Sequence, residues 1–299
     1  MKLVLLGTGD GKVKDRKDSS LWLERGSVAI QFDRSDDHRD YQKPDVLFIT
    51  HYHPDHYSRD AVAGIERVYG PEERDNVKLA KAREVIDDIE VRAVPVDHSV
   101  QSKTVVYFVF TPELRFLYAP DLLTMPASYE LYRRLDLYIG CGSSPDRDIV
   151  YATPDGEVGH ISMRNQEKFV RRLAPSARIV WTHISEETGS QVDGLPNDGN
   201  VIFDSESETR KALDYLVWIP GFISQTGSSV YGKLVGNEVR SPDQARDIDI
   251  VMRFEERLGR LYLDRAARLK IDRFVEAVRG SKPQWQKGDE SRLIVEELH

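Results

Sequence analysis

Three histidines and one aspartate lie within six consecutive positions of this 299-residue chain: His51, His53, Asp55 and His56. Neutral imidazoles and ionised carboxylates are the ligands of zinc, manganese or iron, whereas calcium and magnesium prefer oxygen ligands alone. His51 and His53 stand two residues apart, so on an extended strand end both side chains point the same way and can hold one ion. Asp55 and His56 follow in a turn that can direct them to a second ion. The spacing therefore predicts a metal site.

Three more candidate ligands lie further along the chain: His98, Asp121 and His183. Apolar segments that read as strands precede all of the candidates: 45–49 before the cluster, and 91–96, 115–120 and 177–182 before the other three. A single such histidine is more often a packed core residue. However, α/β proteins place their sites outside the ends of strands, and the pattern of strand followed by ligand is repeated four times. We therefore expect these side chains to converge.

These residues resemble the HxHxDH motif and the downstream ligands of the metallo-β-lactamase fold superfamily, and the likeness spans roughly residues 1–200. The resemblance implies an αββα sandwich that binds two divalent metal ions, zinc in the first place and manganese or iron as alternatives. By that likeness, one ion is held by His51, His53 and His98, the other by Asp55, His56 and His183, and Asp121 bridges them. Asp55 is expected to serve in catalysis as well.

The opening segment, Met1–Gly11, resembles the first strand and glycine turn of the same superfamily. A dinucleotide-binding turn is the alternative interpretation of its glycines. That interpretation is weaker because residue 12 is lysine, so a full GxGxxG is absent, and because no acidic residue follows on a second strand at the expected distance.

His160 indicates a branch of the superfamily. Its context, Gly-His-Ile-Ser at 159–162, resembles that of an additional histidine in the phosphodiesterase branch, which includes tRNase Z-like nucleases and the cyclic phosphodiesterase of the C–P lyase pathway. We therefore expect a dinuclear metal-dependent phosphodiesterase acting on a nucleotide or nucleic-acid phosphodiester, with a metal-activated hydroxide as nucleophile and His160 as general acid. A structural histidine at a helix start is the alternative for His160. For the whole protein, the alternatives are a metallo-hydrolase of a carbon ester, lactone or thioester, or a non-catalytic metal- and nucleotide-binding protein.

A second pattern lies beyond residue 204. Gly227 and Ser228 precede an alternating strand on which Asp247 and Asp249 share one face. Carboxylates so placed could bind magnesium together with a nucleoside triphosphate. The pattern resembles the polymerase β-like nucleotidyltransferases, and an exposed acidic strand edge is the alternative. We therefore expect two domains: a metallo-β-lactamase fold domain at 1–200 and a small α/β nucleotidyltransferase-like domain, incomplete or inactive in one interpretation, at 205–299.

The composition limits the partners of the chain. Lys and Arg number 42 against 50 Asp and Glu, giving a net charge of −8. Because no strongly basic patch is evident, a nucleotide or a single-stranded or terminal nucleic acid suits the chain better than a long duplex. Cys141 is the only cysteine, which excludes an internal disulfide framework, and we expect it to be a small buried hydrophobe. Without a signal peptide or an apolar run of membrane-spanning length, we predict a cytoplasmic protein with no membrane partner. The oligomeric state is not indicated.

Overall fold

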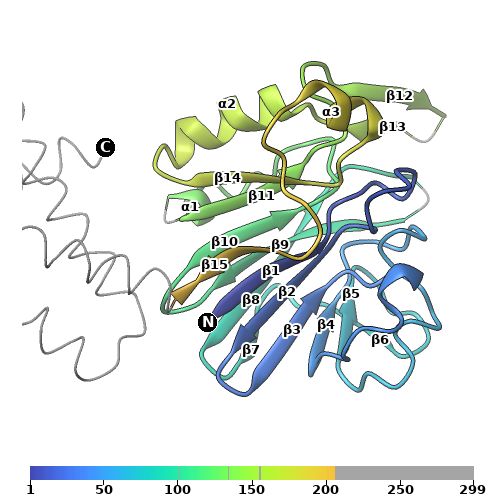
Figure 1. Cartoon of the computed structure of the whole chain (residues 1–299), viewed down its shortest axis with the longest axis vertical. Coiled ribbons are helices and arrows are strands. Elements are labelled where there is room, and N and C mark those ends of the chain that lie inside the picture. Colours follow the sequence, from blue (N-terminus) through green and yellow to red (C-terminus); the bar gives the residue numbers. More distant parts are fainter. Residues whose placement is uncertain (101, 134, 155, 206–299) are drawn as a thin grey trace, which may run out of the picture. The chain divides into compact units, whose positions relative to one another are not determined.

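The computed structural model describes residues 1–100, 102–133, 135–154 and 156–205 (Figure 1). Contacts divide the chain after Asp204, and Met1–Asp204 forms one compact unit. The residues of the second sequence pattern, Gly227, Ser228, Asp247 and Asp249, lie outside the described residues. The nucleotidyltransferase-like domain and its magnesium therefore stay predictions.

One sheet of this unit contains seven strands in the order β15-β1-β2-β3-β4-β5-β6. The strands are β1 (Lys2–Gly7), β2 (Ser20–Arg25), β3 (Val28–Phe32), β4 (Val46–Phe48), β5 (Val68–Gly70), β6 (Val77–Leu79) and β15 (Asn200–Asp204). Strands β3 to β6 pair in parallel, whereas β15, β1, β2 and β3 pair antiparallel. β4 is buried along its whole length, as its uninterrupted apolar sequence predicts for a parallel strand covered on both faces.

The other large sheet contains six strands in the order β14-β11-β10-β9-β8-β7. Its strands are β7 (Glu84–Ile86), β8 (Ile89–Val96), β9 (Thr104–Phe110), β10 (Arg115–Ala119), β11 (Leu137–Cys141) and β14 (Arg178–Thr182). Strands β10, β11 and β14 are parallel, so their carboxyl ends share one edge of the sheet. A separate two-stranded hairpin is formed by β12 (Ile149–Thr153) and β13 (Gly156–His160).

Aromatic side chains join the two sheets face to face. Phe32 and Phe48 of the first sheet contact Tyr107, Phe116 and Tyr118 of the second, with ring centroids 5.2 to 6.1 Å apart. All five side chains are at most 1% exposed. Pairs of this kind stabilise by about 0.5–1.5 kcal/mol each beyond the area that they bury. The core of the unit is therefore the apolar layer between two sheets, which is the sandwich that the resemblance predicts.

The two outer faces of the sandwich are covered differently. Helix α2 (Met163–Leu173) begins at its N-cap Ser162 and packs Phe169, Val170 and Leu173 onto the second sheet beside α1 (Tyr129–Tyr132). Two further short helices are η1 (Asp36–His38) and α3 (Glu186–Gln191). None of the described helices is long and apolar enough to span a bilayer.

On the first sheet, residues 59–64 form turns. Val62, within these turns, and Ile65, just after them, pack against Leu47 of β4. This stretch has only six residues and ends at Gly64, whose φ is +76°. At this point the outer layer is therefore made of turns rather than of the α-helix that an αββα sandwich implies.

Candidate metal centre

The candidate ligands lie just beyond the ends of four strands, one from the first sheet and three from the second. His51 follows β4, His98 follows β8, Asp121 follows β10 and His183 follows β14. The four segments predicted as strands before these residues are confirmed as β4, β8, β10 and β14. Strand ends are rigid and lie at fixed spacings, so side chains that are far apart in the chain are brought to one point.

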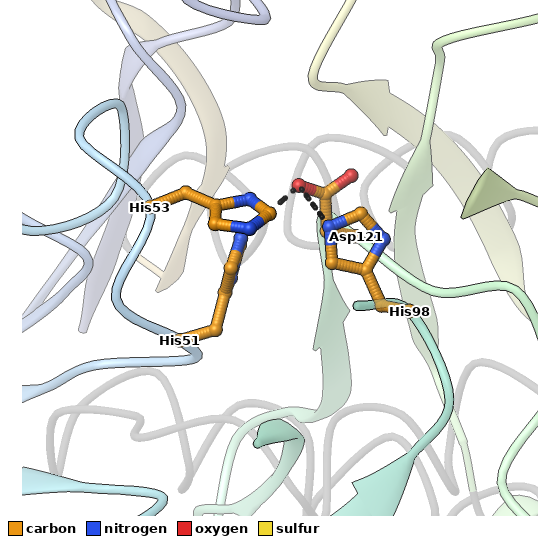
Figure 2. A group of neighbouring side chains, drawn as sticks. All are labelled: His51, His53, His98 and Asp121. Atoms are coloured by element: carbon orange, nitrogen blue, oxygen red, sulfur yellow. Dashed lines mark ion pairs between the residues drawn. The ribbon is translucent and has the colours of Figure 1, made fainter. Parts of the chain in front are cut away.

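The first group consists of His51, His53, His98 and Asp121, whose ligand atoms all lie within 4.8 Å of one another. Figure 2 shows the three imidazole rings gathered around the Asp121 carboxylate. Asp121 Oδ2 is 3.5 Å from Nε2 of His51 and 3.5 Å from Nε2 of His98. These separations leave room for one ion between the side chains.

The second group consists of Asp55, His56, His183 and again Asp121, with ligand atoms within 4.8 Å of one another. His183 Nε2 lies 3.1 Å from Asp121 Oδ2 and 3.2 Å from Asp55 Oδ2. His183 has a φ of +53°, a conformation uncommon outside glycine, and its backbone amide donates a 2.8 Å hydrogen bond to Ser19 Oγ. Backbone strain of this kind concentrates at functional sites. The two groups share Asp121, as the resemblance implies for a bridging aspartate.

Several ring nitrogens in these groups are buried and unpartnered, which tests whether the residues suit a metal. Nε2 of His51, His56 and His98 has no hydrogen-bond partner. His98 donates its other nitrogen, Nδ1, to the carbonyl of Gly159 at 2.9 Å, and His56 Nδ1 donates to Asp33 Oδ2 at 2.8 Å. This leaves a lone pair on each Nε2 aimed into the pocket, which is how metal-binding imidazoles are held. The donor set therefore fits divalent cations.

Asp33 belongs to this centre and is absent from the sequence prediction. It is fully buried and has a φ of +59°. Its carboxylate accepts hydrogen bonds from the Thr50 amide at 2.7 Å and from Thr50 Oγ1 at 2.9 Å, besides the one from His56. A signal for it exists in the sequence, because Asp33 directly follows β3 as Asp121 closely follows β10. The Asp33 carboxylate does not face the pocket. It holds the His56 ring in place by the hydrogen bond from Nδ1, and its negative charge pairs with a protonated His56.

His160, at the end of β13, lies beside the first group, with its ring centroid 4.9 Å from that of His98. His160 Nδ1 is 2.8 Å from Asp121 Oδ1, 3.3 Å from Ser143 Oγ and 3.5 Å from Cys141 Sγ. Cys141 is buried within a hydrophobic core cluster, which confirms the prediction, and its Sγ also lies near the polar side chains of Ser143, His160 and Asp121. Burial raises the pKa of the Cys141 thiol, yet His160 more than offsets this and lowers it to about 6. Asp121, Cys141, His160 and His183 form a third group of ligand atoms within 4.8 Å.

Proton occupancy in the centre depends on burial and on its carboxylates. Burial is the main cause that lowers the pKa of His51 and His98. Burial also acts on His56 and His160, but their carboxylate neighbours prevail: the pKa of His56 is well above its ordinary value, and that of His160 is raised to about 10 with Asp121 as the main cause. Burial raises the pKa of Asp121, but the surrounding imidazoles outweigh it and hold that pKa well below the usual range. Without cations, protons on imidazoles therefore balance the carboxylates, and cations would displace them.

The opening glycine turn borders the second group. Gly11 has a φ of +78°, and a β-carbon at this position would lie 2.8 Å from Asp55 Cβ. A glycine is required here because any side chain would displace Asp55. Close approach to the site thus accounts for this glycine, and no bound nucleotide is needed to explain it.

Comparison with known proteins agrees with the fold. Residues 16–139 match the family model described as "Beta-lactamase superfamily domain". Human tRNase Z, short form, superposes with a TM-score of 0.51 at 17% identity, covering 68% of this chain and 99% of its own. The matched residues, 16–139, belong to a beta-lactamase superfamily domain. A diphosphatase from the PhnP family (19% identity, covering 67% of this chain and 96% of its own, TM-score 0.49) and YhfI from Bacillus subtilis (15%, 67% and 97%, 0.49) also match this domain. No curated protein matches the chain in sequence.

The family match covers part of the metallo-β-lactamase domain only. It includes six of the candidate ligands, His51, His53, Asp55, His56, His98 and Asp121, whereas His160 and His183 lie beyond it. At these identities the superposition shows the fold alone. The roles of the individual side chains therefore depend on the geometry given above.

Proposed function

We propose that this domain is a dinuclear metal-dependent phosphodiesterase acting on a nucleotide or nucleic-acid phosphodiester. The observation that carries the proposal is the pair of ligand groups sharing Asp121, with His160 held 2.8 Å from the other oxygen of the same carboxylate. The printed names of two structures with the same fold, a tRNase and a diphosphatase, are in keeping with phosphoester chemistry. Zinc is the first candidate for both ions, and manganese or iron also suit the donor set.

In this proposal the residues of the chain have separate roles. His51, His53 and His98 would hold one ion, Asp55, His56 and His183 would hold the other, and Asp121 would be shared by both. Divalent ions, when bound, act as Lewis acids on phosphoryl oxygens and lower the pKa of an attacking water. The Asp55 carboxylate, whose side chain is 17% exposed, accepts a proton from that water as it attacks phosphorus.

His160 supplies the proton that the leaving oxygen needs. Its Nδ1 is engaged with Asp121, so Nε2 is the nitrogen that can face the substrate. The side chain is 21% exposed, which gives it access to solvent and to a bound ester. As the phosphorus–oxygen ester bond breaks, the Nε2 proton moves to the leaving alkoxide, and the imidazole is neutral until it is protonated again.

The test combines metal content with turnover. We expect the purified protein to bind two divalent ions and to hydrolyse bis-p-nitrophenyl phosphate. H160A is expected to keep the ions but to lose roughly 10²–10⁴-fold in the cleavage of a thymidine dinucleotide, the usual effect of removing a general acid. V150A is the matched control, because Val150 lies on the same hairpin, is 46% exposed, and has its side chain on the opposite face from His160. H160A that retains full turnover of the dinucleotide would contradict the role of His160.

The leaving group separates acid catalysis from a general loss of activity. p-Nitrophenolate leaves without much need of a proton, whereas a nucleoside alkoxide needs one. H160A should therefore reduce the cleavage of a thymidine dinucleotide more than that of the nitrophenyl ester, and an equal loss on both would contradict acid catalysis. Turnover of a lactone or thioester panel without any phosphodiester cleavage would favour the carbon-ester hydrolase. Two bound ions with no turnover of any ester would favour a binding protein.

A further inference from the structure

The two oxygens of Asp121 face different sets of side chains. Oδ2 lies 3.1–3.5 Å from the histidines of the two ligand groups, His51, His56, His98 and His183. Oδ1 faces the other way, toward His160 Nδ1 at 2.8 Å and Cys141 Sγ at 3.8 Å. The Oδ1 side is thus a distinct cluster of a thiol, an imidazole and a carboxylate.

The spacing of this cluster suits one tetrahedral cation. Zinc–sulfur bonds of about 2.3 Å and zinc–nitrogen or zinc–oxygen bonds of about 2.0–2.1 Å place tetrahedral ligands roughly 3.3–3.6 Å apart. Cys141 Sγ is 3.5 Å from His160 Nδ1 and 3.8 Å from Asp121 Oδ1, and only the 2.8 Å separation of His160 from Asp121 is that of a hydrogen bond. Replacing that hydrogen bond by an ion requires the ligands to part by about half an ångström.

The fourth member of the cluster, His183, is shared with the Asp55–His56 group. Cys141 and His160 are the ligands particular to this position. A thiolate ligand favours soft cations such as zinc or cadmium over manganese or magnesium. The position is therefore chemically different from the two histidine–carboxylate groups.

We propose that Cys141, His160 and Asp121 Oδ1 form a third, inhibitory site for one thiophilic divalent cation. Binding releases to solvent the Nδ1 proton of His160 and any proton still carried by the Cys141 thiol. The His160 ring then keeps only the Nε2 proton of a neutral imidazole, which is far too weak an acid to protonate a leaving alkoxide. This consequence rests on the proposed function, whereas the binding site itself does not.

Cobalt binding tests the site without any substrate, because a thiolate bound to Co²⁺ gives a sulfur-to-metal charge-transfer band in the near ultraviolet. Metal-free protein is titrated with Co²⁺ after its single thiol has been shown to be reduced. We expect about two equivalents to bind without this band, and a further one to produce it. C141S and C141A should lack the band and still bind two ions. No band in the reduced wild-type protein at saturating Co²⁺, or a band from the first equivalent, would overturn the separate site.

Excess Zn²⁺ or Cd²⁺ tests the inhibition, with each protein compared with its own rate at two equivalents of metal. Wild type is expected to lose roughly 10²-fold or more in the cleavage of an alkoxide-leaving phosphodiester, the effect of removing the acid. C141S and C141A should keep their own rates at the same concentration. Equal inhibition of wild type and both variants would overturn the inhibitory role. A protein that lacks phosphodiesterase activity would still show the cobalt band, so the two proposals fail separately.

Discussion

Replacing Asp33 by asparagine changes one atom of a buried group that does not face the pocket. The wild-type carboxylate accepts hydrogen bonds from the Thr50 amide at 2.7 Å, from Thr50 Oγ1 at 2.9 Å and from His56 Nδ1 at 2.8 Å. An amide has one accepting oxygen instead of two. If that oxygen keeps the bonds to Thr50, the amide NH₂ faces His56 Nδ1, and two donors oppose each other. His56 must then carry its proton on Nε2, where it blocks the lone pair that faces the metal pocket.

The expected effect has two measurable parts. Removing a carboxylate that orients a metal-binding histidine usually weakens metal binding about 10–100-fold, or roughly 1.4–2.7 kcal/mol. Because His56 belongs to the Asp55–His183 group, we expect one ion to be lost well before the other. A buried donor left without an acceptor costs about 1–3 kcal/mol, and each kcal/mol lowers Tm by roughly 2–4 °C in a domain of this size.

The assay is a competition titration with a metal chelator, with bound metal counted by mass spectrometry and Tm measured with and without metal. D60N is the matched control, because the Asp60 side chain is 76% exposed and its ion pair with Arg39 is 3.5 Å long. We expect D60N to bind metal like the wild type. Wild-type affinity for both ions in folded D33N would refute the orientation of His56 by Asp33.

Three further predictions follow from the same centre. In the metal-free protein the pKa of His160 is raised from 6.5 to about 10, chiefly because Asp121 outweighs burial. The ion pair therefore contributes its full stability below pH 6.5 and loses it as the pH rises through about 10. Urea unfolding in the presence of a chelator should show the free energy of unfolding falling across this window. In H160Q the slope of that free energy against pH should be smaller by up to about 1.4 kcal/mol per pH unit. An unchanged slope in H160Q would count against this ion pair. G11A should lower Tm and weaken metal binding, because its Cβ would lie 2.8 Å from Asp55 Cβ. G26A is the control for backbone strain alone, because Gly26 has a φ of +59° and nothing lies within 4 Å of a Cβ there. Equal metal affinity in both variants would exclude an effect of the contact with Asp55. Removing the metal should lower Tm, and adding metal back at 100 times Kd should restore about 2.7 kcal/mol of free energy of unfolding per site, which calorimetry can measure. A Tm that does not change with metal would mean that no ion binds the folded state.

Much of the candidate site could be predicted from local sequence. The alternation of His51 and His53, followed by Asp55 and His56, is a short-range pattern whose geometry depends on only a few residues of strand and turn. The strands that precede His98 and His183 are also readable, because an apolar run that ends in a polar residue has a direct physical meaning for a buried strand.

The grouping of these side chains could be assigned only by resemblance, and the structure shows its geometry. Whether Asp121 lies between two histidine sets, with Oδ2 toward both sets and Oδ1 toward His160, depends on the relative position of strand ends that come from different sheets. The turns at 59–64, where a helix was implied, likewise follow from a short segment closed by Gly64.

The sequence by itself determined the ligand chemistry. Imidazoles and carboxylates spaced as in His51, His53, Asp55 and His56 can form a metal site in any fold that brings their side chains together. Only the tertiary structure decided the surroundings of that site. Asp33 is 23 residues from His56, and Cys141 is 19 from His160, so no local periodicity connects either pair. Their contacts exist because the parallel strands β3 and β4, and the end of β11 with the hairpin, bring distant chain segments within hydrogen-bond distance. The residues that tune the metal centre are therefore positioned by the hydrophobic packing of the two sheets. This packing does not depend on which polar residues lie at the sheet edges.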